Sequence, residues 1–226
     1  MKLLVCGGRD YTDEGTAFKV LDHVSKPVDT IISGAAKGAD TIGSNWAKTR
    51  GKSLLEFPAN WGAYGKSAGP IRNMQMLVEG SPDFVLAFPG GKGTEHMLSI
   101  SEHEGIPTTR VIFVFGSNTH GIHGAGAAKW ARTHYQAEQG VGIGHTGWAY
   151  ALPTKHTPYE TIRLNEIELW YTSFLDDIAD SPNLYYLTPV GSGLAGYSLT
   201  EIAEATILKH GYPDNVVLAH TWGVYK

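Results

Sequence analysis

Short, mostly apolar runs recur along the chain, and a glycine-rich turn follows most of them. Leu3–Val5, Thr30–Ile32 and Phe84–Phe88 show this pattern in the first half, and Val111–Phe115 and Tyr185–Thr188 repeat it in the second. Runs of this length, rich in β-branched and aromatic residues, predict buried strands.

Apolar residues at helical spacing come after several of these turns. They are Phe18, Leu21 and Val24 in one segment, and Leu164, Ile167, Tyr171, Phe174 and Ile178 in another. Ser198 and Glu201 have capping-box spacing before a helix predicted over 202–210, and Gly211 ends it. Repeated strand, turn and helix predict an α/β fold with a mostly parallel sheet, in which ligands bind beyond the carboxyl ends of the strands.

Composition narrows the class of protein. The chain has 226 residues, 28 of them glycine, and a formal net charge of -4. The glycines have no triplet period and proline is not abundant, so neither collagen nor a disordered linker fits. The single cysteine, Cys6, excludes a disulfide framework and a thiolate zinc cluster. No apolar run is long enough for a membrane helix, and we expect a soluble, cytoplasmic protein with no membrane partner.

The first half ends near Glu104–Pro107, and a new strand is predicted from Arg110. Thr108–Thr109 is too short for a flexible tether, so we expect two domains, 1–108 and 110–226, that pack closely. The alternative is one continuous domain of about nine strands.

Five basic residues of the first half lie in or beside glycine motifs: Arg9, Lys37, Lys66, Arg72 and Lys92. Glycine turns at helix N-termini free backbone N–H groups for anions, and nearby cations strengthen such sites. The alternative is that these are solvated surface charges. Residues 60–67 approach the P-loop spacing, but Asn60 replaces its first glycine, and the dinucleotide fingerprint is absent as well.

Five motifs, in order over residues 1–108, resemble the YspA-like branch of the SLOG superfamily. They are Gly7–Tyr11, Ser33–Asp40 with Trp46, Pro58–Trp61, Gly65–Asn73 with Met76, and Phe88–Thr94 with Met97. The resemblance implies a Rossmann-like nucleotide site formed by Gly8, Arg9, Gly34, Asp40, Arg72, Asn73, Gly90, Gly91, Gly93 and Thr94, with Lys37 as an added phosphate-binding cation.

The motifs leave several candidates for the catalytic residue. The related Lonely Guy hydrolases carry a glutamate two or three residues after the motif threonine, whereas His96 and Met97 stand there in this chain. Glu95 directly follows the threonine and is a candidate catalyst or an acid favoured by the helix dipole. Asp10 and Asp40 are further candidates, able to hold a ribose hydroxyl or act as a base.

The second half, residues 110–226, resembles the macrodomain pattern in the order of its motifs: a strand ending in Asn118, a glycine turn into a helix predicted over 127–138, and a late glycine loop. This resemblance implies an ADP-ribose or nucleotide site. Its residues would be Asn118, Gly124, Gly126 and Ala127 on one side, and Gly191, Gly193, Leu194, Gly196 and Tyr197 around the diphosphate. The alternative is that these glycines are packing turns only.

His120 and His123 share a loop without a nearby carboxylate, so we predict no metal site and no cofactor. His123 remains a candidate general acid or base. The function we expect is binding and hydrolysis, at an N-glycosidic or ribose-linked bond, of ADP-ribose, an NAD-derived product or a nucleoside monophosphate. One alternative is a non-catalytic nucleotide sensor or sequestering protein. Nucleic-acid binding is disfavoured by the acidic net charge, and a homo-oligomer is expected by analogy.

Overall fold

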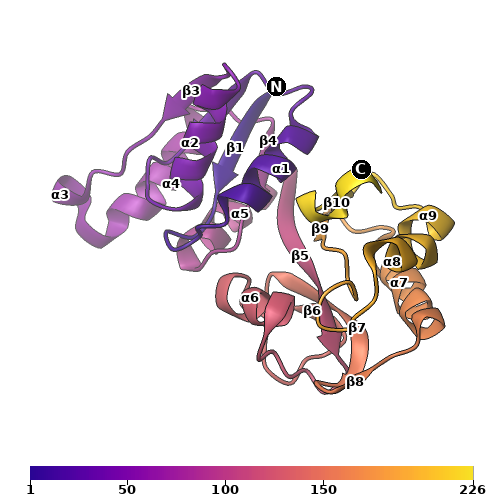
Figure 1. Cartoon of the computed structure of the whole chain (residues 1–226). Helices are drawn as coiled ribbons and strands as arrows, with labels where there is room; N and C mark the ends of the chain where they lie inside the picture. The colour runs from indigo at the N-terminus through magenta and orange to yellow at the C-terminus, as the bar shows by residue number, and fades with distance from the viewer. Residues whose placement is uncertain (226) are drawn as a thin grey trace. The chain divides into compact units, whose positions relative to one another are not determined.

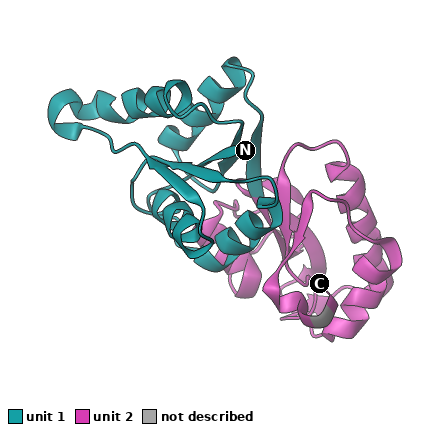
Figure 2. Ribbon diagram, turned by 90° about the horizontal axis from the view of Figure 1, so that it is seen from above, with its two compact units in different colours: residues 1–111 teal, residues 112–226 magenta. Residues whose placement is uncertain are grey.

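The computed structural model describes residues 1–225 and divides the chain into two compact units, Met1–Val111 and Ile112–Lys226. Figure 2 shows the two units in different colours. Strand β5 (Thr108–Asn118) begins in the first unit and ends in the second. The predicted join therefore falls inside a strand rather than in a loop. The assignment of a function to each domain stays a prediction.

The first unit is a doubly wound parallel sheet (Figure 1). Its elements are β1 (Lys2–Cys6), α1 (Glu14–Val24), β2 (Thr30–Ser33), α2 (Ala39–Thr49), β3 (Ser53–Glu56), α3 (Trp61–Tyr64), the 3₁₀ turn η1 (Gly65–Ser67), α4 (Ala68–Val78), β4 (Phe84–Ala87) and α5 (Lys92–His103). The strand order is β3-β2-β1-β4, with residues 108–110 of β5 beside β4, and every pair is parallel. Helix α1 contacts α2, and α4 contacts α5. The direction of winding reverses between β1 and β4.

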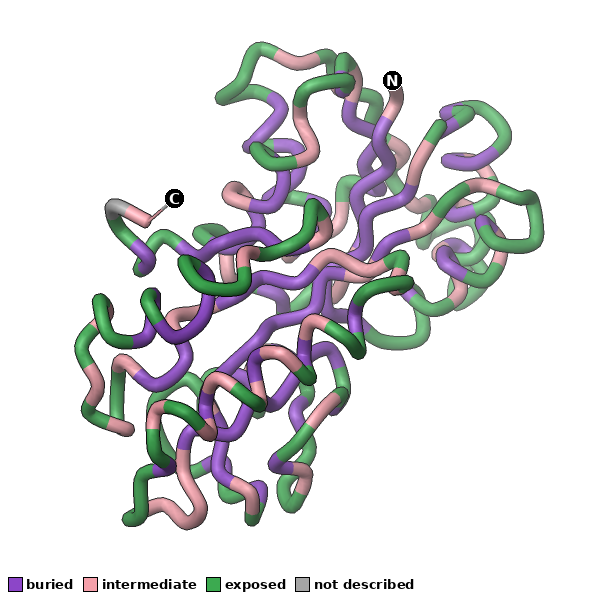
Figure 3. Tube along the Cα trace, turned by 90° about the vertical axis from the view of Figure 1, so that its right-hand side faces the viewer, coloured by how far each residue is buried: buried purple, intermediate pink, exposed green. Residues whose placement is uncertain are grey.

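Burial explains why the central strands read as continuous apolar runs. Leu3, Leu4 and Val5 of β1 are wholly buried, although neighbouring side chains of a strand point to opposite faces of the sheet. A parallel sheet covered by helices on both faces needs apolar residues at successive positions. Figure 3 shows this buried interior as purple stretches of the trace.

Helix α1 forms where the sequence predicts a helix, but a different face is buried. The buried residues are Thr16, Ala17, Val20 and Leu21, whereas Phe18 is only partly covered and carries the Arg50 guanidinium 6.0 Å from its ring centroid. Of the three residues whose spacing predicts a helix face, Leu21 is buried, whereas Phe18 and Val24 are partly exposed.

The second unit is also an α/β sheet. Its elements are the remainder of β5, α6 (Gly126–His134), β6 (Gly144–Thr146), β7 (Ala149–Thr157), β8 (Glu160–Thr161), α7 (Leu164–Ile178), β9 (Leu184–Leu187), α8 (Leu199–Ala205), α9 (Ile207–His210), β10 (Val216–Leu218) and the 3₁₀ segment η2 (His220–Tyr225). The order is β10-β9-β5-β7. Strand β7 runs parallel to β5 and β10 runs parallel to β9, whereas the short β6 and β8 run antiparallel to β7.

The helices of this unit can be compared with those that the sequence predicts. Helix α7 buries Ile167, Tyr171, Phe174 and Ile178, which are four of the five residues that its spacing predicts. The capping box of Ser198 and Glu201 is present at the start of α8. The single helix predicted over 202–210 is instead broken at Thr206, whose backbone (φ -124°, ψ -97°) is not helical. Helix α6 begins near the predicted start but ends at His134, before the predicted 138.

The predicted α/β class with a mostly parallel sheet is confirmed, and the first unit has a Rossmann-like architecture. The macrodomain-like identity of the second unit stays a prediction. Within residues 1–225, every helix is too short or too polar to cross a bilayer.

We expect Gly43→Ala to destabilise the first unit, because a Cβ at Gly43 of α2 would lie 2.9 Å from Cγ1 of Val5 in β1. Overpacking of this kind costs about 1–3 kcal/mol of unfolding free energy, which urea denaturation would measure. The matched control is Gly15→Ala in α1, where the nearest atom lies 3.8 Å away. That change should be neutral or stabilise by up to about 1 kcal/mol. Equal effects of the two variants would contradict this account of the α2–β1 contact.

Candidate functional site

The loops after β1 and β4 meet at the point where the winding of the first sheet reverses. The amide of Gly8 donates to the carbonyl of Pro89 at 2.8 Å. A Cβ on Gly90 would lie 2.8 Å from the Gly8 nitrogen, so the two backbones touch where side chains would collide. Such a switch point is where open α/β sheets bind ligands.

The loop after β2 closes against the same place. The amide of Ala39, at the start of α2, donates to the Gly8 carbonyl at 3.2 Å. Gly38 has φ +76°, and a Cβ there would lie 2.1 Å from the same carbonyl oxygen. One amide at the N-terminus of α2 is therefore used to join two loops rather than left for a ligand.

A buried ion pair connects this arrangement to α4. Arg72 donates through Nη1 to the Gly34 carbonyl and, at 3.3 Å, to Oδ2 of Asp40. The two side chains are only 14% and 7% exposed. The amide of Ala36 also donates to Oδ2 of Asp40, at 3.2 Å. A Cβ on Gly34 would overlap the Arg72 guanidinium, so this glycine is required by the ion pair itself.

Burial is the largest influence on the pKa values of Asp40 and Cys6. It raises the pKa of the Asp40 carboxyl, and the positive charge of Arg72 opposes that rise only in part. Burial likewise raises the pKa of the Cys6 thiol, with the charge of Asp40 adding to the effect. Cys6 is therefore a packed apolar residue and not a reactive thiolate.

Asn73 extends the polar chain from the ion pair to α5. Its Oδ1 accepts from Nε of Arg72 at 3.1 Å, and its Nδ2 lies 3.0 Å from the Gly93 carbonyl and 3.1 Å from Nδ1 of His96. His96 was not among the predicted site residues. The signal that could have found it is its position in the second turn of a helix that begins with a glycine motif.

The N-terminus of α5 is the open part of the site. A Cβ on Gly91 or Gly93 would meet no atom of the chain within 4 Å, and neither residue has a positive φ. The amides of Lys92 and Gly93 donate no hydrogen bond to other described residues, as is usual for the first turn of a helix. These N–H groups at the positive end of the helix dipole suit an anion such as phosphate.

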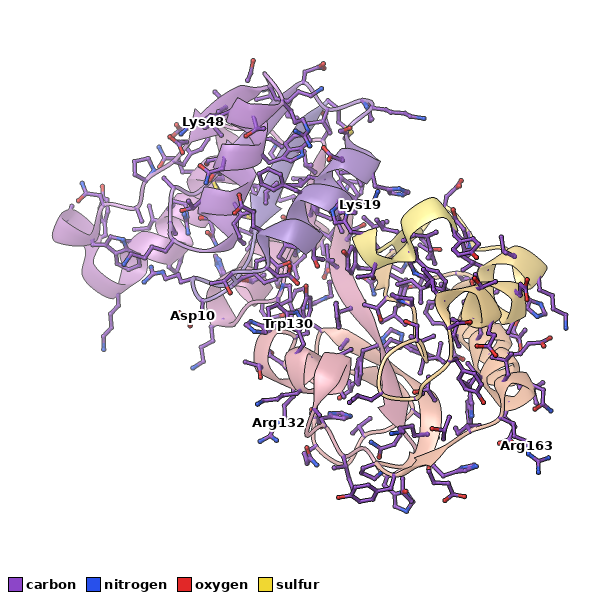
Figure 4. The ribbon with its side chains drawn as sticks, viewed as in Figure 1. Asp10, Lys19, Lys48, Trp130, Arg132 and Arg163 are labelled. Atoms are coloured by element: carbon purple, nitrogen blue, oxygen red, sulfur yellow. The ribbon has the colours of Figure 1, made fainter. Side chains whose placement is uncertain are left out.

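The structure brings together most of the predicted residues of the first half. Gly8, Gly34, Asp40, Arg72, Asn73, Gly90, Gly91, Gly93 and Thr94 lie in or next to the three joined loops and the start of α5. Arg9 is exposed, and its guanidinium lies 4.9 Å from the centroid of the Trp61 ring. Lys37 and Asp10 are exposed as well, and Figure 4 shows Asp10 on the outside of the loop that follows β1.

Both carboxylate oxygens of Glu95 are hydrogen-bonded to Arg110. The two side chains form a bidentate pair, with N–O distances of 2.8 and 2.7 Å. This bonding lowers the pKa of the Glu95 carboxyl, which therefore stays ionised and cannot serve as an acid near neutral pH. Its role as the catalytic residue stays a prediction that this pairing does not favour.

Comparison with known proteins identifies a family match within the first unit. Residues 1–64 match the model of the YspA, cpYpsA-related SLOG family. The Gene 61 protein of Mycobacterium phage D29 is 34% identical over 116 residues, which cover 47% of this chain and 92% of the phage protein. Residues 1–64 belong to the SLOG family. No solved structure matches it significantly. Membership in the SLOG family points to a nucleotide-related ligand-binding role.

The SLOG match does not include the second unit, whose glycine loops are of two kinds. Gly191 has φ +93°, and a Cβ there would lie 2.6 Å from Cδ1 of Ile202, so this glycine is needed for packing. Gly124 and Gly193 face open space instead. The two predicted loops do adjoin, because Cδ1 of Leu194 lies 3.1 Å from a Cβ built on Gly126.

Two side chains of the second unit that were predicted to contact a ligand form hydrogen bonds with other residues of the chain. The side-chain amide of Asn118 donates to the Ile122 carbonyl at 2.8 Å and accepts from the Ile122 amide at 3.1 Å. The Tyr197 hydroxyl donates to the Ile162 carbonyl at 2.7 Å. Ala127 and Gly196 are exposed near these loops, but no interaction ties them to a common site.

His123 is wholly buried, and both of its ring nitrogens lack a hydrogen-bond partner. The ring packs edge-on against Phe115, with 5.2 Å between the centroids. Burial lowers its pKa, so the folded chain holds it neutral. Within residues 1–225, no group of three or more His, Cys, Asp or Glu side chains could hold a metal ion.

Replacing Arg72 alone should lower the unfolding free energy far more than replacing Arg72 and Asp40 together. Arg72→Met leaves the Asp40 carboxylate buried without its partner, which costs about 3–5 kcal/mol of unfolding free energy. The double variant Arg72→Met/Asp40→Asn removes the charge as well and should recover at least half of that loss. Urea denaturation of the four proteins of this cycle measures the coupling. Additive losses would show that the two side chains do not interact.

The unfolding free energy should decrease as the pH is lowered, because His123 resists protonation in the folded chain. Its pKa is lowered in the folded chain, so below about pH 6.5 the unfolded chain binds a proton that the folded chain does not. The unfolding free energy should drop by up to about 1.4 kcal/mol per pH unit between pH 6.5 and 5. His123→Leu should remove that part of the slope, whereas His103→Leu, at an exposed position in α5, should leave it unchanged. An unaltered slope in His123→Leu would refute the assignment.

Proposed function

We propose that the first unit binds a nucleotide-derived ligand that carries a ribose phosphate, such as AMP, ADP-ribose or an NAD-derived product. The observation that carries this proposal is the open start of α5. Free amides of Lys92 and Gly93 stand there beside three joined glycine loops and the buried Arg72–Asp40 pair. Family membership independently supports a ligand of this class.

Each part of such a ligand has a chemical counterpart in the first unit. The α5 amides suit a phosphate. Asp40 accepts hydrogen bonds from Ala36 and Arg72 through Oδ2 only, which leaves Oδ1 to accept from a ribose hydroxyl. Trp61 is 49% exposed and already lies under the Arg9 guanidinium, so its ring suits a stacked base.

Hydrolysis of the bound nucleotide is the second candidate function, and Asp40 is the observation that favours it. Of the predicted catalytic residues Asp10, Asp40, Glu95 and His123, only Asp40 lies where the three loops join. Water would attack the anomeric carbon, and the bond to the base or ribose substituent would break with its electrons leaving on that group. The Asp40 carboxylate would stabilise the positive charge that develops on the sugar or take the proton from the water.

For the second unit we propose an ADP-ribose or nucleotide site of the macrodomain type. Support comes from the meeting of the Gly126 and Leu194 loops at the carboxyl ends of the neighbouring strands β5 and β9. A homo-oligomer and a cytoplasmic location stay expectations.

Binding should depend on the open glycine of α5. Gly93→Ala adds a methyl group that touches nothing in the chain, so the fold should be unchanged or more stable by up to about 1 kcal/mol. A phosphate approaching the helix would meet that methyl, and we expect the affinity for AMP or ADP-ribose, measured by calorimetry, to fall at least about tenfold. Gly15→Ala is the matched control and should bind as the unmodified chain does.

If no AMP, ADP-ribose or NAD binds to the unmodified chain, the proposed ligand class is wrong. Hydrolysis is examined separately, by incubating the chain with each nucleotide and measuring released base or ribose phosphate. Turnover that is lost in Asp40→Asn but kept in Glu95→Gln would support Asp40 as the catalytic residue. Tight binding without any product would support the sensor alternative.

A further inference from the structure

His96 stands at the end of a continuous chain of polar side chains that begins at the buried ion pair. Asp40 contacts Arg72, Arg72 contacts Asn73, and Asn73 contacts His96, with distances of 3.3, 3.1 and 3.1 Å. Asn73 is buried and His96 is half-buried. The histidine ring is thus oriented by side chains that are largely buried.

The partners of Asn73 determine which way its amide points. Nε of Arg72 can only donate, so the atom facing it is the oxygen of Asn73. The Gly93 carbonyl can only accept, so the atom facing it is the amide nitrogen. The same nitrogen lies against Nδ1 of His96, and its second hydrogen points there.

The tautomer of His96 follows from this orientation. Nδ1 accepts a hydrogen bond from Asn73 and therefore carries no proton, because a proton there would face the hydrogens of the amide. The ring proton is on Nε2. In this tautomer the ring donor, Nε2–H, points away from Asn73.

We propose that His96 contacts the ligand of the first unit, donating from Nε2–H to an oxygen of its phosphate or ribose. This inference rests on the proposed function of that unit. Helical side chains lean towards the helix N-terminus, and the Asn73 contact places the ring beside Gly93, where the helix faces open space. Asn73 is the positioning residue that acts through His96.

The tautomer is tested without any ligand. In ¹⁵N spectra of histidine side chains of the full chain at pH 8, His96 should show a protonated Nε2 and an unprotonated Nδ1. Asn73→Asp replaces the amide by an acceptor, and the His96 proton should move to Nδ1. A wild-type spectrum with the proton on Nδ1, or no change of His96 in Asn73→Asp, would overturn the proposed orientation.

The ligand contact is tested by calorimetry with AMP and ADP-ribose. We expect His96→Ala and His96→Phe to bind about 3- to 10-fold more weakly, as for loss of one neutral hydrogen bond. His96→Gln, which keeps an N–H near the position of Nε2, should stay within about threefold of the unmodified chain. His103→Ala, exposed on the same helix, should bind normally.

The outcomes separate the two proposals. If the unmodified chain binds and His96→Ala binds equally well, the role of His96 is refuted and the proposed function stands. If the unmodified chain binds neither nucleotide, the proposed function fails and the contact fails with it, while the spectra still decide the tautomer.

Discussion

The buried pair of Arg72 and Asp40 is the constraint on which the first unit depends. It joins α4 to the loop after β2, and Asn73 carries the connection on to α5. A buried charge without its partner is strongly destabilising, so neither side chain is replaceable alone. Gly34 lacks a side chain because the guanidinium fills that space. The electrostatics of one pair thus sets both the geometry of the loops and part of the glycine pattern.

Glycine serves two different purposes in this chain, and only the structure separates them. Gly8, Gly38 and Gly90 allow backbones to cross so closely that a methyl group would collide with the chain. Gly91 and Gly93 border open space and have ordinary backbone angles, so neither packing nor conformation requires them. Another physical reason for a glycine is that the missing side chain lets a ligand approach the backbone amide closely. In the proposed function the ligand therefore faces the start of α5, and the other glycines hold the loops around it.

Patterns set by burial and backbone were predictable from the sequence, whereas pairings between distant side chains were not. The β1 run and the α7 face follow from periodicity, because each must bury a continuous apolar surface. Glu95 was expected at a ligand, yet Arg110, 15 residues along the chain, occupies its carboxylate. Thr206 breaks a helix whose apolar spacing continues through it. The SLOG motifs located the loops but did not show that Asn73 connects Arg72 to His96.

The carboxylates of the first unit favour recognition over rapid chemistry. Glu95 is ionised and committed to Arg110, and one oxygen of Asp40 is committed to Arg72 and Ala36. The polar chain from the same Arg72 orients the His96 ring through Asn73. Acid–base catalysis needs a group that can gain and lose a proton during the reaction, and of these two carboxylates Asp40 is the one with an oxygen, Oδ1, outside the bonds to Arg72 and Ala36. A ligand would find its hydrogen-bond donors and acceptors already in place, which is the arrangement that lowers the entropy cost of binding.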